Sequence, residues 1–367
     1  MLSKERMKEK FLEMIKIYSP SKEEKEMADY LESWLREKGI SYWSDNAGKE
    51  YGGNGINIVA FLPGEGEPIG FCAHMDQIEP CRDIHPVIEE NWIRTDGTTT
   101  LGGDDKGGIA VILEAVEDII ETDTPHRDIY LVFTCSEEIS MLGSKNMDMS
   151  MLPCKQLVIA DATGKSGPIA YRAPAMETIK VIFHGKKAHA GIEPEKGINA
   201  IKVAADAISQ MHIGRIDDLT TSNIGRIEGG SATNIVTDYV EFTAEIRSHN
   251  MDRLKEERDY MEQCCKNAAA HADTTYEFKS DLAYPALVLE KGASIIKEAV
   301  QAYKEEGIKS ELIVIGGGSD ANIFAGYGLQ SVILGLGMEQ VHTVEEKLNL
   351  EEAFTTAKVI RRMMIAK

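Results

Sequence analysis

Five short segments of this 367-residue chain carry acidic and imidazole side chains that could bind metal ions. In chain order they contain His74-x-Asp76, Asp104-Asp105, Glu137-Glu138, Asp161 and His342. Divalent ions of borderline softness such as zinc bind imidazole nitrogen and carboxylate oxygen, and a site for two such ions needs about this set of ligands. The pattern therefore indicates a hydrolase that uses two metal ions.

Each segment taken alone also has a structural explanation. The triplet in GFCAHMD could be an ordinary hydrogen bond, although Asp76 stands where it could accept the second N–H of a metal-bound His74. LGGDDKGG could be a phosphate loop, a helix N-cap or a carboxylate bridge between cations, but it lacks the Gly-Lys-Ser/Thr of a P-loop. The acid pair in TCSEE could be a solvated turn, Asp161 a turn acid and His342 a surface histidine. The metal site is favoured because all five segments would otherwise carry ligand-type residues by chance.

Apolar runs of strand length lead into most of these segments. Continuous apolar stretches occupy 56–62, 69–73, 129–134 and 157–160, and a helical pattern covers 106–122 directly after the Asp pair. Strands that are apolar on both sides are typical of an α/β sheet with helices on its two faces. In open sheets of this kind, active sites lie beyond the carboxyl ends of the strands, so we expect the five segments to converge there.

Two helices are expected before the first strand. Apolar residues at helical spacing predict a helix over 8–17. Ser21 then begins a Ser-Lys-Glu-Glu capping-box pattern, which predicts the start of a second helix that ends near Gly39.

The middle of the chain has a different pattern. Strands are predicted at 176–184, 223–227, 240–247 and 275–279, and helices at 198–211 and 251–271. This order, βαββαβ, is that of a ferredoxin-like domain. After Pro285 the α/β character returns, with a helix at 293–306 and strands at 312–315 and 331–334. We therefore predict one domain formed by 1–173 and 286–367, with a second domain, 174–285, inserted into it.

The composition narrows the possible partners. A net charge of −20 disfavours nucleic acid and anionic membranes, because both would repel the protein. The six cysteines show no CxxC spacing, which predicts reduced core residues. The first residues lack an apolar signal segment, and no window reaches about 18 apolar residues. We expect a soluble cytoplasmic protein.

The motifs also resemble those of a known family, the M20 metallopeptidases, and within it the peptidase T (tripeptide aminopeptidase) group. The shared segments, in order, are AHMD, TTTLGGDDKGGIA, FTCSEE, the Asp161 turn, HAGIEPEKGINA, GGSATNIV followed by EIR, GGGSDAN and VHTVEE. They extend over nearly the whole chain. The resemblance implies a zinc-peptidase catalytic domain with a mixed sheet and helices on both faces, plus an inserted lid and dimerisation domain of the ferredoxin-like type.

The resemblance also implies a set of metal ligands. His74 and Asp161 would hold one ion, and Glu138 and His342 the other. Asp104 would bridge the two ions. Zinc is the expected metal, with cobalt and manganese as alternatives.

Further residues receive catalytic and substrate-binding roles from the same resemblance. Asp76 would orient His74, and Glu137 would act as general base and later as acid. His189 would help to stabilise the tetrahedral oxyanion, often from the neighbouring subunit of a dimer. The residues expected to contact the substrate are Asn234, Arg247, and Gly317 and Gly318 of the Gly316–Gly318 turn.

The implied activity is that of an aminopeptidase which removes the N-terminal residue from short peptides. Asp161 resembles the aminopeptidase and dipeptidase branch, because the deacylases of the family often have glutamate there. The alternatives are a dipeptidase, or an amidohydrolase that cleaves N-acyl or N-carbamoyl amino acids. A non-catalytic protein that binds metal or peptide is a remote alternative, since Glu137 and all five ligand candidates are present. A homodimer through the inserted domain is also expected.

Overall fold

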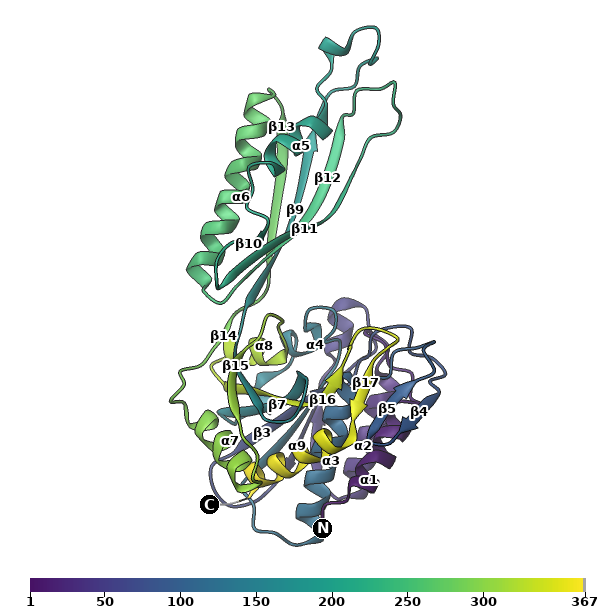
Figure 1. Ribbon diagram of the computed structural model, residues 1–367, viewed down its shortest axis with the longest axis vertical. Helices are drawn as coiled ribbons and strands as arrows, with labels where there is room; N and C mark the ends of the chain where they lie inside the picture. Colours follow the sequence, from purple (N-terminus) through teal and green to yellow (C-terminus); the bar gives the residue numbers. More distant parts are fainter. Residues whose placement is uncertain (366–367) are drawn as a thin grey trace. The chain divides into compact units, whose positions relative to one another are not determined.

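Two units share the chain in the computed structural model, which describes residues 1–365 (Figure 1). The first unit contains Met1–Ala173, Leu287–Ile315 and the chain from Ser319 onward. The second contains Pro174–Ala286 and Gly316–Gly318. None of the helices within residues 1–365 has the length and apolar character that a membrane crossing requires.

Within the described residues, a mixed sheet of twelve strands forms the centre of the first unit. Its main path runs β1-β2-β6-β3-β7-β16-β17-β5-β4, and β8 joins β14 and β15 to β16. Strand β3 (Ile69–His74) is parallel to β6 (Ile129–Thr134) and to β7 (Gln156–Thr163), which is parallel to β16 (Gln330–Glu339). The carboxyl ends of these four strands therefore share one edge. The other strands are β1 (Ser41–Ser44), β2 (Ile58–Leu62), β4 (Pro86–Glu89), β5 (Trp92–Thr95), β8 (Pro168–Ala173), β14 (Leu287–Val288), β15 (Glu311–Val314) and β17 (Lys347–Asn349).

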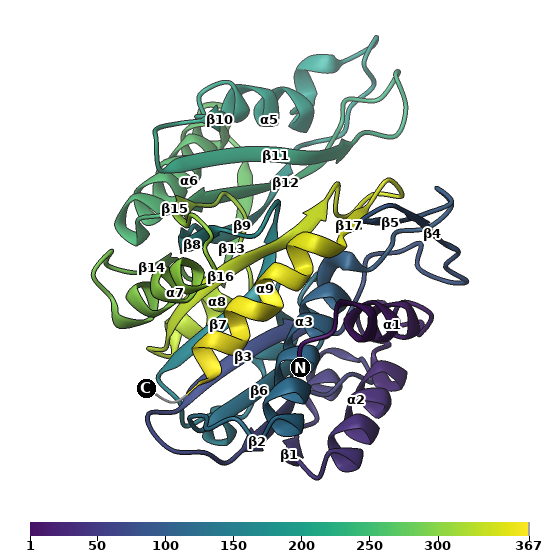
Figure 2. The ribbon, with the colours of Figure 1, turned by 60° about the horizontal axis from the view of Figure 1, so that its bottom comes forward.

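Helices cover both faces of this sheet, as two separate apolar clusters show. One face carries α1 (Lys4–Met14), α2 (Lys25–Glu37), α3 (Gly103–Glu121), α7 (Ser294–Glu305) and α9 (Leu350–Met364). The other carries α4 (Leu142–Lys145) and α8 (Asp320–Gly326). Figure 2 shows α3 and α9 side by side in front of the strands. Short 3-10 helices are η1 (Ala47–Tyr51), η2 (Met149–Met151) and, in the second unit, η3 (Pro194–Lys196).

Helix α3 is the central helix of the first unit and lies very close to the sheet. Ile109, Ile112 and Val116 are fully buried, and burial of such a side chain contributes about 1.5–3 kcal/mol. A Cβ atom on Gly108 would lie 2.2 Å from the carbonyl oxygen of Ala160 in β7. Glycine at this position therefore lets the first turn of α3 approach the strand.

The second unit is a five-stranded antiparallel sheet with helices α5 (Ala200–Ile208) and α6 (Met251–His271). The strand order is β10-β11-β12-β9-β13. Figure 1 shows α6 lying along this sheet, and one apolar cluster joins both helices to it. The predicted fold class, with its ferredoxin-like unit, is confirmed. The strands are β9 (Ala175–His184), β10 (Gly214–Arg215), β11 (Thr220–Gly229), β12 (Tyr239–Ser248) and β13 (Thr275–Tyr284).

The capping box expected at Ser21 is wrong. Helix α2 begins at Lys25, and its N-cap residue Glu24 makes no side-chain cap bond. Ser21 instead donates its hydroxyl to Asp76 Oδ2 at 2.7 Å, and Glu24 accepts the N–H and hydroxyl of Ser136. Both side chains support the ends of β3 and β6 rather than a helix.

Candidate metal centre

The five predicted ligands come together at the carboxyl ends of the parallel strands in the first unit. His74 is the last residue of β3, and Asp161 lies within β7. Glu138 follows β6, Asp104 stands at the start of α3, and His342 lies in the turn after β16. Parallel strands and one helix start thus deliver side chains that are up to 268 positions apart, from 74 to 342, to one place.

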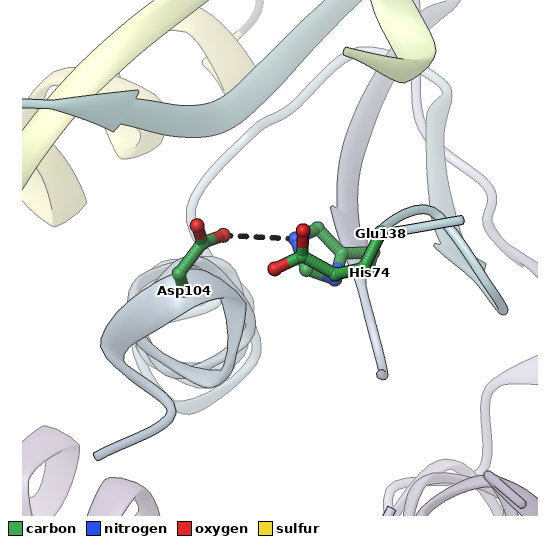
Figure 3. Close-up of side chains that lie close together, drawn as sticks. All are labelled: His74, Asp104 and Glu138. Carbon is green, nitrogen blue, oxygen red and sulfur yellow. Dashed lines mark hydrogen bonds and ion pairs between the residues drawn. The ribbon is translucent and has the colours of Figure 1, made fainter. Parts of the chain in front are cut away.

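An unbroken series of contacts joins these five side chains. His342 Nε2 lies 2.9 Å from Glu138 Oε2 and 3.2 Å from Asp104 Oδ2. His74 Nε2 lies 2.9 Å from Asp104 Oδ1 and 3.8 Å from Asp161 Oδ1. Figure 3 shows the side chains of His74, Asp104 and Glu138 directed toward one another. Asp104 therefore stands between two imidazoles, with one oxygen facing each.

Asp105 belongs to this cluster as well, although the sequence reasoning gave it no metal or catalytic role. Ligand-type atoms of His74, Asp105 and Asp161 lie within 4.8 Å of one another, as do those of His74, Asp104 and Glu138. The carboxylate of Asp105 accepts the backbone N–H of His74 at 3.2 Å and that of Gly108 at 3.0 Å. The N-cap explanation of LGGDDKGG thus fits Asp105, while Asp104 faces the histidines.

Negative charge accumulates in this cluster. Burial, with the charge of Asp104, raises the pKa of Asp161 well above its ordinary value, and burial with the charge of Asp161 does the same for Glu137. Burial also raises the pKa of Glu138, and Glu138 Oε1 is buried with no hydrogen-bond partner. In residues 1–365 no lysine or arginine forms an ion pair with these three carboxylates.

The two imidazoles respond to the same charge. Hydrogen bonds to Asp104 and Glu138 raise the pKa of His342 to about 10, against the effect of burial. Burial opposes protonation of His74, but Asp104 and Asp76 outweigh it and raise its pKa. Burial likewise opposes ionisation of Asp104, but hydrogen bonds with both histidines hold its pKa below the ordinary range. The cluster therefore favours positive charge at its centre.

Asp76 organises the residues around it. Its Oδ1 accepts the backbone N–H of Glu137 at 2.9 Å and lies 3.3 Å from His74 Nδ1. Its Oδ2 accepts the backbone N–H of Glu138 at 3.1 Å. Because Nδ1 of His74 faces Asp76, Nε2 points toward Asp104. One buried carboxylate thus fixes both an imidazole and the turn that bears the glutamate pair.

That glutamate turn has a second support that the sequence reasoning missed. Ser136 adopts a left-handed conformation, φ +51°, and its N–H donates to Glu24 Oε1 at 2.8 Å. The backbone N–H groups of 136, 137 and 138 are thus accepted by two carboxylates, those of Glu24 and Asp76. A left-handed residue after β6 changes the direction of the chain, so that Glu137 and Glu138 no longer alternate as in a strand. No local sequence pattern pairs Glu24 with residue 136.

The remaining predicted residues lie in the second unit. His189 and Asn234 are exposed, and their loops pair through the bond from Ala190 N to the carbonyl of Asn234 at 3.0 Å. Arg247 donates to both oxygens of Glu245, at 2.9 and 3.2 Å, and to the carbonyl of Gly316 at 3.4 Å. The second unit therefore groups His189 with Asn234, and Arg247 with the Gly316–Gly318 turn.

Comparisons with known proteins agree with this architecture. A model of the M20 peptidase dimerisation domain matches residues 176–273, and one described as M42 glutamyl aminopeptidase matches 87–167. The uncharacterized protein YqjE of Bacillus subtilis is 38% identical over 98% of both chains. The crystal structure of aminopeptidase PepT from Bacillus cereus is 35% identical, covers 99% of this chain and 98% of its own, and superposes with a TM-score of 0.94. For a tripeptidase from Staphylococcus aureus the identity is 32%, the coverage 99% and 98%, and the TM-score 0.96.

The two-unit fold and the cluster of acids and histidines define a hydrolase of the metallopeptidase class. The M42 model matches only part of the first unit. The PepT and tripeptidase structures match 99% of the chain, and they favour the M20 model over the M42 model. This chain belongs to the M20 peptidase family, and within it to the peptidase T group. It is an aminopeptidase, as the sequence motifs predicted.

Proposed function

We propose that the protein is a two-zinc aminopeptidase which releases the N-terminal residue of tripeptides and similar short peptides. His74 and Asp161 would hold one ion, Glu138 and His342 the other, and Asp104 would bridge them. The observation that carries this assignment is the position of Asp104, whose two oxygens face His74 and His342 at 2.9 and 3.2 Å. Cobalt and manganese are the alternative metals.

The donor set fits such ions chemically. Imidazole nitrogen and carboxylate oxygen are common zinc ligands, and a buried carboxylate is costly unless a positive charge compensates it. Asp161 and Glu138 are largely buried, and their contacts in residues 1–365 provide no lysine or arginine. The high pKa of His342, about 10, reflects the same need for a cation.

In the proposed mechanism, Glu137 accepts a proton from the attacking water and passes it to the leaving amine. Proton transfer of this kind typically contributes about 10²- to 10⁴-fold. The pKa of Glu137 is raised by burial and by Asp161, which favours proton uptake. When bound, two divalent ions lower the pKa of water toward about 7 and polarise the substrate carbonyl. Asp76 holds His74 and the Glu137 backbone, and His189 offsets the charge of the oxyanion.

Substrate recognition is assigned to the second unit. Arg247 carries five N–H donors, and its contacts with Glu245 and Gly316 use three of them. The remaining donors suit the terminal carboxylate of a short peptide. Asn234 and the turn residues Gly317 and Gly318 would hold the peptide backbone. The naming of one relative as a tripeptidase supports tripeptides as the substrate.

The domain roles, assembly and location are also proposals. Residues 1–173 and 286–367 would form the catalytic domain, and 174–285 a lid through which two chains form a homodimer. The edge of β11 supports such a dimer. Strand β10 pairs only with Thr221 and Ser222 of β11, and in the described chain no other strand covers the rest of that edge, where Ile227 is 52% exposed. A second chain could pair there. Six free, buried cysteines support a cytoplasmic location, and the net charge of −20 disfavours nucleic acid and membrane partners.

A panel of free and N-acetylated di- and tripeptides tests the proposal. The full-length enzyme is assayed with and without a chelator, and zinc, cobalt and manganese are restored in turn. We expect release of the N-terminal residue from unblocked tripeptides, loss of activity with chelator, and recovery with zinc. Cleavage of the acetylated substrates alone would identify a deacylase, preference for dipeptides would identify a dipeptidase, and no cleavage of any peptide would rule out the aminopeptidase.

A further inference from the structure

The carboxylate of Glu346 is buried inside the loop that leads to Asp104. Glu346 is 2% exposed, and its Oε2 accepts the backbone N–H of Leu101 at 2.7 Å and that of Gly102 at 3.0 Å. Its Oε1 accepts the backbone N–H of Asp104 at 2.9 Å. Three N–H groups of four consecutive residues therefore point at one side chain, which comes from a segment more than 240 positions away.

The same glutamate is attached to the turn that carries His342. It lies four residues after His342, and its own N–H donates to the carbonyl of Thr343 at 3.2 Å. Thr343 in turn donates its hydroxyl to the carbonyl of Gln340 at 2.7 Å, which closes the turn after β16. His342 has a left-handed φ of +65°, so this turn has a specific shape that these bonds hold.

The loop around Glu346 is fitted to the carboxylate. Gly102 has a φ of +80°, which favours glycine, and this conformation turns two successive N–H groups toward Glu346. A Cβ atom on Gly103 would lie 3.0 Å from Glu346 Oε1, a distance that forces a shift of a few tenths of an ångström. A glutamine in place of Glu346 would bring an NH₂ group against backbone N–H donors, because all three partners donate.

We propose that Glu346 is a positioning residue that couples the Asp104 loop to the His342 turn. By holding both segments, it sets the relative position of the Asp104 carboxylate and the His342 imidazole, which lie 3.2 Å apart. The inference rests on the proposed function, in which these two residues share a metal ion. Groups that orient metal ligands typically change metal affinity or activity by about 10- to 100-fold when they are replaced.

The test compares Glu346→Gln with Glu345→Gln in the full-length, zinc-loaded enzyme. Glu345 is the exposed neighbour in the same turn, and within residues 1–365 its side chain forms no hydrogen bond or ion pair with the site. Each variant is titrated with a chelator, the zinc retained per chain is measured by emission spectroscopy, and kcat and KM are determined with a tripeptide. For Glu346→Gln we expect zinc loss at about 10- to 100-fold lower chelator concentration, a lower kcat and an unchanged KM. Glu345→Gln should match the wild type.

Other outcomes separate the inference from the function on which it rests. Wild-type zinc retention and kcat in Glu346→Gln would overturn the positioning role, provided that Asp104→Asn loses zinc. If Asp104→Asn also retains zinc at wild-type level, the bridging assignment itself is wrong. Should Glu346→Gln fail to fold, Gly103→Ala perturbs the same contact without removing the charge, and it must lower zinc retention for the inference to stand.

Discussion

Two groups of carboxylates in the first unit have similar composition and opposite surroundings. The site carboxylates are Asp104, Asp105, Glu137, Glu138 and Asp161, and the helix carboxylates are Glu114, Glu117, Asp118 and Glu121 in the second half of α3. Helix α3 contains members of both groups, because its first turn lies at the site and its second half lies away from the site on the same face of the sheet. A difference in surroundings, not in residue type, therefore has to explain what each group does.

The helix carboxylates are paired with basic side chains. Arg6 contacts both oxygens of Glu114 at 2.7 and 2.8 Å, and Lys10 and Lys38 lie 2.8 and 2.6 Å from Glu117. Asp118 forms an ion pair with Arg361. The site carboxylates in the described residues have two histidines as their cationic partners and no lysine or arginine. Carboxylates that have their cations serve stability, whereas those without them are suited to bind ions from solution.

The largest expected effect comes from Glu137, the one site carboxylate with no proposed part in holding metal or its ligands. Glu137→Gln should lower kcat by about 10²- to 10⁴-fold while zinc content stays unchanged, because a proton acceptor is lost and no ligand is removed. The matched helix variant, Glu117→Gln, should keep the wild-type kcat. Steady-state kinetics together with metal analysis check both variants. Wild-type hydrolysis by Glu137→Gln would contradict its role as the base.

Removal of His342 should change the number of ions that the enzyme retains. We expect His342→Ala to hold about one zinc per chain where the wild type holds about two, since the ion shared with Glu138 loses its imidazole. The exposed His85, which lies outside both groups, provides the control variant His85→Ala. Metal content after dialysis gives the answer. Two retained ions in His342→Ala would mean that this histidine is not a ligand.

The third prediction tests whether removing a charge at each group changes the free energy of unfolding in opposite directions. Arg6→Ala leaves Glu114, which is fully buried, without its arginine, and should lower the free energy of unfolding by about 3 kcal/mol. Asp161→Asn removes a buried carboxylate that no lysine or arginine within residues 1–365 pairs with, so in the metal-free enzyme it should raise that free energy. Urea unfolding of metal-free proteins measures both. The comparison fails if Asp161→Asn destabilises the metal-free enzyme as Arg6→Ala does.

How far the sequence predicted these groups depends on whether the signal was local. The strands and helices that carry His74, Asp104 and Glu138 follow from uninterrupted apolar runs and one helical repeat, and the fold class was predicted correctly. Strand β16 was predicted only over 331–334, because Gly335 and Gly337 interrupt the apolar run; its register shifts near Gly335, where glycines are typical of irregular strands. The turn that carries His342 follows residues 335–339, the part of β16 that was not predicted.

Of the supporting residues, Asp76 was predicted because it stands two positions after His74, but those from distant segments were not. Ser21 and Glu24 fit a capping box equally well, and only the folded chain brings them to Asp76 and Ser136. Glu346 accepts N–H groups of a loop near residue 101. Every residue other than proline has such a backbone donor, so the sequence does not show which ones bind a carboxylate. Ligand residue types, and a supporting group as near in sequence as Asp76, can thus be recognised locally. The supporting contacts of Ser21, Glu24 and Glu346 join distant segments and appear only in the folded chain.

The last expected effect is a pH dependence of stability that separates the two groups once more. In the metal-free enzyme, Glu137 and Asp161 have raised pKa values. Carboxyls in the unfolded chain ionise above about pH 4, so above this pH the folded state binds more protons than the unfolded state. The pKa of His342, about 10 against about 6.5 when unfolded, acts in the same direction, since its contribution is complete below pH 6.5 and is lost as pH rises toward 10. The free energy of unfolding of the metal-free enzyme should therefore fall as pH rises from 5 to 8.

Zinc binding reverses this dependence, because the ligands must be deprotonated to bind the metal. The difference in the free energy of unfolding between zinc-loaded and metal-free enzyme should therefore grow from pH 5 to pH 8, by about 1.4 kcal/mol per pH unit for each proton displaced. For Asp118, burial opposes ionisation but Arg361 outweighs it and lowers the pKa, so its contribution is lost only below about pH 4. Asp118 should accordingly add no pH dependence to stability between pH 5 and pH 8. Calorimetry of the zinc-loaded and metal-free proteins measures this trend. A stabilisation by zinc that shrinks as pH rises would show that the site carboxylates are not the groups that the metal relieves.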